Sequence, residues 1–179
     1  MRQLGNTDLK RLHREWRRRT HGRLALLLDG VQSPFNVGAI IRTAAALRVE
    51  HVWFAGGGTT PANSRIDKTA MGTARLLQWS EADDAATAVR SARDAGWTCI
   101  ALELTDTARP LHDLDLSAAA VCLVVGHEDR GVSPGALDAC DLAAYLPLVG
   151  RVGSLNVATA ASMACYEVRR QEWATAPDA

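Results

Sequence analysis

The stretch RLALLLDGVQSPFNVGAIIRTAAALRVEHVWFA, residues 23–55, predicts the fold of the whole chain. Arg23–Asp29 is a continuous apolar run, which is typical of a strand buried on both faces of a sheet. Turn residues follow, and Val37–Leu47 has the pattern of a helix. His51–Ala55 then has the pattern of a second, short strand. A strand, a helix and a strand in this order indicate an α/β domain with a mostly parallel sheet.

The alternation continues to the end of the chain. Further strands are predicted in RLLQW (75–79), WTCIALEL (97–104), AAVCLVVG (119–126) and LAAYLPL (142–148). Helices are predicted over 67–73, over 81–95 with Gly96 as its end, over 133–139 behind a Ser-Pro pair, and over 154–173. We therefore expect helices on both faces of the sheet, with ligand-binding loops beyond the carboxyl ends of its strands.

Length and composition indicate a single globular domain. A length of 179 residues suits one domain, no apolar run approaches the length of a membrane span, and the N-terminus has no apolar core of a signal peptide. We therefore expect a cytoplasmic protein without membrane contact. The four cysteines, at 99, 122, 140 and 165, form no C-x-x-C pair and lie in apolar surroundings. That spacing favours small buried side chains over a metal site or a disulfide framework.

Charge is concentrated at the N-terminus. Residues 1–23 hold eight Lys and Arg against two acids, a net charge of +6, so the remainder of this neutral chain carries −6. A uniformly basic, RNA-coating surface is thereby excluded. The segment predicts a helical arm capped by Asn6 or Asp8 and ended by Gly22, with an apolar stripe of Leu9, Leu12 and Trp16.

A second face of this arm carries Arg11, Arg14 and Arg18. Two interpretations stay open. The stripe can pack on the body and leave a solvated basic face, or the basic face can contact a polyanion such as RNA.

Three loops at predicted strand ends carry unusual residues, and the first is Gly30–Asn36. Asn36 is a good N-cap for the helix behind it. Arg42 lies one turn after Gly38, so its side chain is expected to lie back over this glycine toward the helix N-terminus. We expect it to meet a phosphate or a carboxylate there. The alternative is a structural ion pair with a local acid such as Asp29.

The second loop is Gly126–Gly131, whose glycines permit positive φ or close backbone approach. Glu128 follows a buried strand directly, which makes it a candidate acid, acceptor or orienting group. His127 is more typical of a structural hydrogen bond than of catalysis. The chain contains neither G-x-G-x-x-G nor a P-loop sequence, and it lacks a nucleophile elbow, so a dehydrogenase or hydrolase on this sheet is disfavoured.

The third loop spans Pro147–Asn156. Pro147 ends the preceding strand, and Ser154 is expected to cap the last helix with Asn156 in its first turn. The small residues of VATAASMAC behind it indicate a tight helix–helix contact or close packing on the sheet.

Taken in order, NVGAIIRTA, VVGHEDRGVS and LPLVGRVGSLNVATAAS resemble the three motifs of the SpoU/TrmH family. Its members are S-adenosylmethionine-dependent RNA ribose 2′-O-methyltransferases of the SPOUT class. The resemblance extends from about Leu24 to Tyr166, and SLNVA in its glycine context is its most distinctive element. Leu148 stands where the family often has Met, and His127 stands at a variable position.

The resemblance implies a methyltransferase domain over 24–173, preceded by the basic extension 1–23 and followed by a tail, 174–179. It implies a deep C-terminal trefoil knot, which sequence patterns alone exclude by default. The knot would bind S-adenosylmethionine in a bent conformation. It also implies a homodimer through the knot region, which would suit the small-residue face of the last helix.

Carried over by position, the family's catalytic residues correspond here to Asn36, Arg42, Glu128, Ser154 and Asn156. Its cofactor-binding positions correspond to Leu102, Gly126, Leu146, Ser154 and Leu155, mostly through backbone atoms.

The role of Arg42 stays open between two alternatives. The family proposal makes this arginine the general base, yet guanidinium groups stay protonated in proteins. A clamp on the phosphate beside the target ribose is physically easier.

The resemblance implies an RNA substrate and not DNA, because the reacting group is a 2′-hydroxyl. With one short basic extension and no separate RNA-binding domain, tRNA is favoured over rRNA, and no metal is expected. A non-catalytic RNA-binding protein of the same fold is the remaining alternative.

Overall fold

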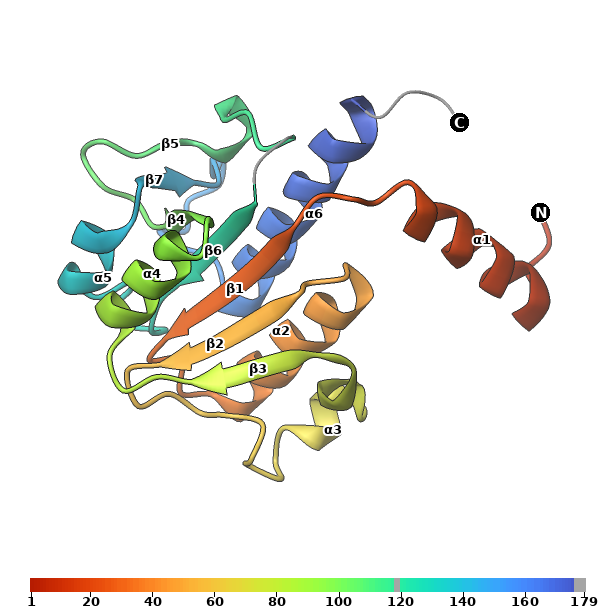
Figure 1. Ribbon diagram of the computed structural model, residues 1–179, viewed down its shortest axis with the longest axis horizontal. Coiled ribbons are helices and arrows are strands. Elements are labelled where there is room, and N and C mark those ends of the chain that lie inside the picture. The colour runs from red at the N-terminus through yellow and green to blue at the C-terminus, as the bar shows by residue number, and fades with distance from the viewer. Residues whose placement is uncertain (118–119, 176–179) are drawn as a thin grey trace.

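The computed structural model describes residues 1–117 and 120–175. Within them, seven strands form one sheet in the order β3-β2-β1-β6-β4-β7-β5, and every neighbouring pair is parallel (Figure 1). The strands are β1 (Leu24–Asp29), β2 (His51–Ala55), β3 (Gln78–Glu81), β4 (Thr98–Leu102), β5 (Arg109–Pro110), β6 (Val121–Val125) and β7 (Leu142–Tyr145). The parallel α/β sheet predicted from the sequence is confirmed.

The two most apolar runs form neighbouring strands in the middle of the sheet. Every residue of β1 and of β6 is buried, and the strands pair in register from Leu24 opposite Val121 to Leu28 opposite Val125. Strands covered on both faces have no water-facing side, which is why both runs lack polar alternation. The start of the β6 run at position 119 lies outside the described residues.

Helices cover both faces of the sheet, as expected. On one face α2 (Pro34–Ala46) packs against α6 (Val157–Thr175), where the hydroxyls of Thr43 and Ser162 lie 2.9 Å apart. On the other face α4 (Ala85–Asp94) packs against α5 (Pro134–Ala139). Each face therefore has its own apolar core.

The small residues of α6 pack inside their own chain. Ala158, Ala161 and Ala164 are buried in the core that α6 shares with α2 and the sheet. The outward side of α6 instead exposes Met163 and Tyr166. These three alanines are therefore unavailable for a contact between chains, and the dimer implied by the resemblance stays a prediction.

Two predicted bounds move for local reasons. The strand expected over 75–79 is a 3-10 turn, η1 (Thr73–Leu76), followed by β3. The helix expected from Glu81 begins at Ala85, because Asp84 accepts hydrogen bonds from the N–H and hydroxyl of Thr87 and caps it there.

The short helix α3 (Asp67–Ala70) ends where Met71 and Gly72 adopt left-handed conformations. A further 3-10 turn, η2 (Leu111–Asp113), follows β5.

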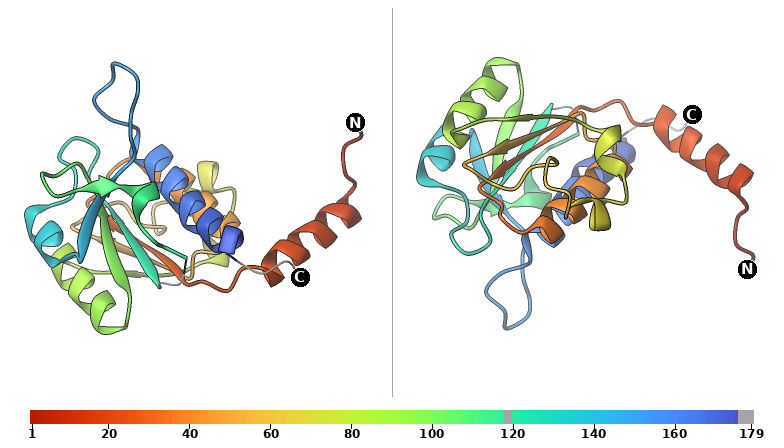
Figure 2. Two further views of the ribbon diagram at one scale, coloured as in Figure 1. Left: turned by 90° about the horizontal axis from the view of Figure 1, so that it is seen from above. Right: turned by 90° about the horizontal axis from the view of Figure 1, so that it is seen from below.

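The basic arm is a helix that projects from the body (Figures 1 and 2). This helix, α1 (Asn6–Arg18), has no buried residue, and Leu9, Leu12 and Trp16 are all exposed. Packing of the stripe on the body is thus wrong, apart from the ring of Trp16, whose centroid lies 5.0 Å from that of Trp173. Gly5 precedes the helix without a side-chain cap, and the helix ends at Arg18, before Gly22.

A buried polar network holds the root of the arm. The backbone N–H groups of His21 and Gly22 donate to the Glu172 carboxylate. Arg169, which is 1% exposed, forms a 2.8 Å salt bridge with Glu172 and donates to the carbonyl of Gly22. Its other N–H groups donate to the carbonyls of Leu47 and Arg48. The chain therefore leaves the body in a fixed direction, although α1 itself buries nothing.

Among the helices in residues 1–117 and 120–175, none combines the length and apolar character needed to cross a membrane. The same residues contain no group of three or more His, Cys, Asp or Glu side chains arranged to hold a metal ion. Three of the four cysteines are buried, Cys140 is partly buried, and all are free thiols.

Candidate active site at the carboxyl ends of the strands

The three loops singled out in the sequence meet at one edge of the sheet. They follow β1, β6 and β7, whose carboxyl ends lie together because the strands are parallel. Hydrogen bonds join the loops directly, so the site belongs to the described chain's own fold.

Asn156, Asn36 and Glu128 form a hydrogen-bond relay across these loops. Asn156 Oδ1 accepts from the N–H groups of Ala158 and Thr159, at 2.9 and 3.2 Å, so Asn156 caps α6. Asn156 Nδ2 donates to Asn36 Oδ1 over 2.9 Å, and Asn36 Nδ2 donates to Glu128 Oε1 over 2.8 Å. Backbone N–H groups can only donate, so they fix the orientation of both amides in turn.

The N-terminal caps of α2 and α6 differ from the predicted ones. Ser33, followed by Pro34, caps α2 and accepts from the Asn36 N–H over 3.4 Å. Asn36 lies in the first turn, which frees its side chain for the relay. Asn156, rather than Ser154, caps α6, and Ser154 stays exposed in the loop before it.

Glu128 is held as a carboxylate. Burial raises its pKa, but hydrogen bonds from Asn36 Nδ2 and from the N–H groups of Gln32 and Ser33, at 3.1 and 3.0 Å, outweigh burial. The pKa of Glu128 is lowered overall. Of the roles expected for Glu128, acceptor and orienting group fit this environment, and proton donor does not.

The loop that carries Glu128 is closed at its base. His127 and Gly131 exchange backbone hydrogen bonds of 3.0 and 2.9 Å. Gly131 has φ +67°, and a Cβ on Gly126 would lie 2.0 Å from the carbonyl carbon of Gly131. The positive φ expected for this loop occurs at Gly131, whereas Gly126 is required by close backbone approach.

Glu103 supports this loop and was not singled out in the sequence. Its carboxylate accepts from the N–H groups of Leu104 and Val132, at 3.1 and 3.0 Å, and so ties the loop after β4 to the base of the Glu128 loop. An acid directly after a buried strand was the signal that identified Glu128. The same signal applied to β4 would have found Glu103.

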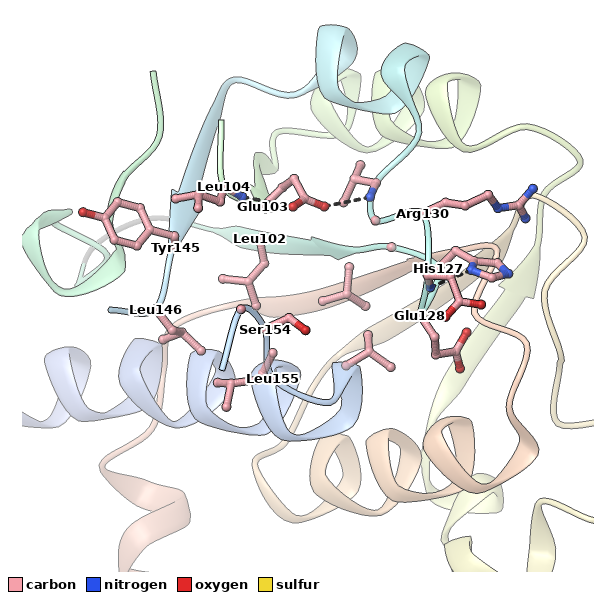
Figure 3. A pocket seen from close by; sticks show the side chains of 18 of the residues that line it. Leu102, Glu103, Leu104, His127, Glu128, Arg130, Tyr145, Leu146, Ser154 and Leu155 are labelled. Atoms are coloured by element: carbon pink, nitrogen blue, oxygen red, sulfur yellow. Dashed lines mark hydrogen bonds between the residues drawn. The ribbon is translucent and has the colours of Figure 1, made fainter. Parts of the chain in front are cut away.

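A pocket of about 800 Å³ opens between these loops (Figure 3). All five residues expected to bind the cofactor line it: Leu102, Gly126, Leu146, Ser154 and Leu155. Glu128 also lies on its wall, and the Ser154 side chain is drawn among the lining groups (Figure 3). The loops that the sequence analysis paired with the cofactor thus enclose one cavity.

The lining suits S-adenosylmethionine. The cavity falls within the size range of small-molecule sites. Leu102, Leu146 and Leu155 provide an apolar wall of the kind that contacts an aromatic base. Glu103 and Glu128 place two carboxylic side chains on a wall that would face a cationic ligand.

Arg42 lies outside both the pocket lining and the relay. It is exposed, and its Nη1 contacts the sulfur of Met71 at 2.8 Å. The expected free space over Gly38 is absent, since a Cβ on Gly38 would lie 2.7 Å from the Thr69 Cβ. The alternative of an ion pair with Asp29 is also wrong, because Asp29 Oδ2 accepts from the Ser133 N–H over 2.7 Å.

The basic residues of the arm lie far from this site. Arg11, Arg14 and Arg18 belong to α1, which joins the amino end of β1, whereas the pocket lies beyond the carboxyl ends of the strands (Figure 1). β1 alone spans roughly 20 Å at about 3.3 Å per residue. Within one chain, the arm and the pocket are on opposite edges of the sheet.

Comparison with known proteins confirms the resemblance to the SpoU/TrmH family that the three motifs indicated. Residues 23–166 match the model of the SpoU rRNA methylase family. A curated relative, the 23S rRNA (guanosine-2′-O-)-methyltransferase RlmB of Acinetobacter baylyi, is 34% identical over 149 residues, which cover 83% of this chain and 60% of the relative. The chain spans about half to three fifths of the length of the curated relatives it matches.

Solved structures share the fold. The AdoMet-bound rRNA methyltransferase from Sinorhizobium meliloti superposes with a TM-score of 0.78 at 28% identity, over 84% of this chain and 57% of that one. A structure described as giving insights into 2-OH methylation of C/U34 on tRNA has a TM-score of 0.73 at 25% identity, over 84% of this chain and 96% of that one. The expected SPOUT architecture is confirmed, and the trefoil knot stays a prediction.

Proposed function

Because this chain belongs to the SpoU methylase family, we propose that it transfers a methyl group from S-adenosylmethionine to a ribose 2′-hydroxyl of RNA. One observation carries this proposal: the pocket lined by the cofactor positions shares Glu128 with the Asn156–Asn36–Glu128 relay. A site for a methyl donor and a set of oriented polar groups therefore adjoin. Methyl transfer needs such proximity, which supplies several kcal/mol in well-oriented reactions.

In this proposal S-adenosylmethionine supplies an electrophilic methyl group on a sulfonium. Leu102, Leu146 and Leu155 bind its apolar part, and Gly126 allows the backbone to approach it. Ser154 and Asn156 lie at the N-terminal end of α6, where they orient the incoming ribose. Glu128 stays charged and holds Asn36 in place, so neither residue needs to exchange a proton.

We assign Arg42 to the phosphate next to the target ribose. An exposed guanidinium without an acid partner among the described residues is free to bind an anion. Its one polar contact among the described residues is the Met71 thioether, so its other N–H groups can donate to a phosphate. The 2′-hydroxyl proton then goes to the substrate phosphate or to solvent rather than to Arg42.

The preferred substrate in this proposal is tRNA. It is supported by the similarity to the C/U34 tRNA structure, 96% of which is matched. The name of the Acinetobacter baylyi relative favours rRNA instead, so 23S rRNA is the second candidate. In either case the arm is proposed to bind the RNA backbone through Arg11, Arg14 and Arg18, away from the reacting nucleotide.

A cytoplasmic homodimer through the knot region completes the proposal. Apolar side chains are exposed on the loop between β7 and α6, which extends from the body (Figure 2), and on neighbouring elements. They are Leu148, Val149, Val152, Phe35, Met163 and Tyr166. Exposed apolar side chains in one region are typical of a protein–protein interface.

A tritium-transfer assay tests the function. Purified protein is given labelled S-adenosylmethionine with separate pools of unmodified tRNA and rRNA, and the labelled nucleoside is mapped after nuclease digestion. Label in one tRNA ribose is the expected result. Label only in rRNA would replace the substrate, and absence of both label and cofactor binding by calorimetry would contradict the proposal.

A further inference from the structure

The basic arm does not explain how the RNA backbone is bound beside the reacting ribose. Its cations lie beyond the amino ends of the strands, and the reacting ribose would lie beyond the carboxyl ends. A ribose cannot enter the site without the phosphates on either side of it. Within one chain, some other surface must therefore receive the RNA backbone near the pocket.

Charge in the body is divided along the sequence. Residues 30–80 carry five Lys and Arg against two acids, whereas residues 81–179 carry seven against fifteen. The only basic part of the body is thus the part that contains α2, α3 and η1. The remainder would repel a polyanion.

Four of the seven arginines in residues 81–179 form salt bridges, whereas the exposed cations of residues 30–80 form none within the described residues. Salt bridges join Arg90 to Asp84, Arg93 to Asp141, Arg169 to Glu172 and Arg170 to Glu167. Within residues 1–117 and 120–175, no salt bridge involves the exposed side chains of Arg42, Arg65, Lys68 or Arg75. We call these four residues the α3 cation surface.

The α3 cation surface is fixed to the helix that begins at the site. α3 packs on α2 so closely that a Cβ on Gly38 would meet both the Thr69 side chain and the carbonyl oxygen of Ile66, at 2.7 and 3.0 Å. Met71, at φ +51°, then brings its sulfur to Arg42.

This helix links the surface to the relay. Asn36 contacts Glu128 in the first turn of α2, and Arg42 follows six residues later, about 9 Å along the axis. Phosphates adjacent in a nucleic-acid strand are spaced on a similar scale, so a strand leaving the pocket along α2 would meet Arg42 first. Lys68 and Arg75 lie on the elements packed beside that helix.

We propose that the α3 cation surface binds the phosphate backbone of the substrate RNA next to the target nucleotide. The inference rests on the proposed function and assigns a second RNA contact to it, separate from the arm. Arg42 binds the nearest phosphate, and Arg65, Lys68 and Arg75 bind the phosphates that follow. Of the two acids in residues 30–80, Asp67 is the one on α3, where it opposes the contact.

The test compares two double variants that lose the same charge. Lys68→Ala/Arg75→Ala removes half of the surface, whereas Arg90→Ala/Arg109→Ala removes exposed arginines that bond to Asp84 and to the Asp113 carbonyl. Affinity for unmodified tRNA is measured by fluorescence anisotropy from about 50 to 200 mM salt. The first variant should bind at least about tenfold more weakly, with a salt slope smaller by roughly 2. The second should resemble the wild type.

Further measurements and variants distinguish a lost RNA contact from a damaged fold. Calorimetry with S-adenosylmethionine and thermal unfolding should be unchanged in both variants, and Lys68→Gln/Arg75→Gln should reproduce the loss. Asp67→Asn should strengthen RNA binding, an effect of opposite sign that damage to the fold cannot produce.

Equal affinity and slope in both double variants would overturn the inference and leave the proposed function standing. A wild-type protein that binds S-adenosylmethionine but no tRNA or rRNA would overturn both.

Discussion

Asn36 and Glu128, 92 positions apart in the chain, are joined by a 2.8 Å hydrogen bond from the amide nitrogen to the carboxylate. The direction of that bond is set by the last helix, because Asn156 accepts from the N-terminal backbone of α6 and must therefore donate to Asn36. The N-terminal end of α6 thus sets the donor-to-acceptor direction of every hydrogen bond in the relay. Any change that reverses one amide disturbs all three side chains.

Asn36→Asp should impair catalysis more than Asn36→Ala. Aspartate removes the donor to Glu128 and places a second carboxylate beside it, whereas alanine removes both side-chain bonds of Asn36 but adds no charge. We expect kcat/KM to fall about 100-fold or more for Asn36→Asp, the scale associated with misplaced reacting groups. Single-turnover methylation measures this effect, and S-adenosylmethionine binding serves as the control. Equal activities of the two variants would argue against the relay.

Gly131→Ala should weaken cofactor binding. The new Cβ would lie 2.1 Å from Glu103 Oε2 at a backbone φ of +67°, so Glu103 would have to leave the Val132 N–H. The left-handed conformation adds about 1–3 kcal/mol. Calorimetry should show weaker S-adenosylmethionine binding and thermal unfolding a lower midpoint.

Gly150→Ala is the matched control for that variant. Gly150 also lies in a loop beside the pocket, but a Cβ there has no atom within 4 Å and its φ is not positive. It should leave both measurements unchanged. A similar loss in the two variants would mean that loop stiffness, and not the Glu103 contact, is responsible.

Gly38→Ala should separate α3 from α2. The Cβ would approach the Thr69 Cβ to 2.7 Å and the Ile66 carbonyl to 3.0 Å, and neither can move away without shifting α3. The Met71 contact to Arg42 would be lost with it. We expect weaker RNA binding with cofactor binding retained, measured by anisotropy and calorimetry. Gly135→Ala, whose Cβ meets only the Ala86 side chain at 3.5 Å, should behave as the wild type.

The Glu172 carboxylate at the root of the arm should make the free energy of unfolding fall in acid. Burial raises the pKa of Glu172, but hydrogen bonds from Gly22, His21 and Arg169 outweigh it, so its pKa is lowered below the ordinary value of 4.5. A lowered folded pKa gives stability that is present above the unfolded value and is lost as pH falls through the folded one. Urea unfolding between neutral pH and strong acid should show this loss, and Glu172→Gln should flatten it.

Arg169→Ala tests the same network at neutral pH. Removing the guanidinium leaves Glu172 without its charge partner and three carbonyl groups without a donor. Breaking a buried pair in this way typically costs about 3–5 kcal/mol. Arg170→Ala, which removes an exposed pair with Glu167, should leave the free energy of unfolding nearly unchanged. Comparable losses in these two variants would contradict the structural role of Arg169.

The sheet and its helices can be predicted from the sequence, because burial on both faces dictates the composition of β1 and β6. The same holds for the loops of the site, since parallel strands bring their carboxyl ends to one edge. These are consequences of local patterns that tertiary structure did not need to modify.

The partners of the polar side chains depend instead on how distant segments pack together. Ser33 and Asn156 cap helices that Asn36 and Ser154 were expected to cap, because either residue of each pair satisfies the local rule. Glu103 and Arg42 meet partners from distant elements, which short-range spacing does not encode. The direction of the arm likewise depends on Arg169, buried some 150 residues from the helix it holds. Hydrogen-bond partners are selected by what the fold brings within about 3 Å, and that selection is made across the whole chain.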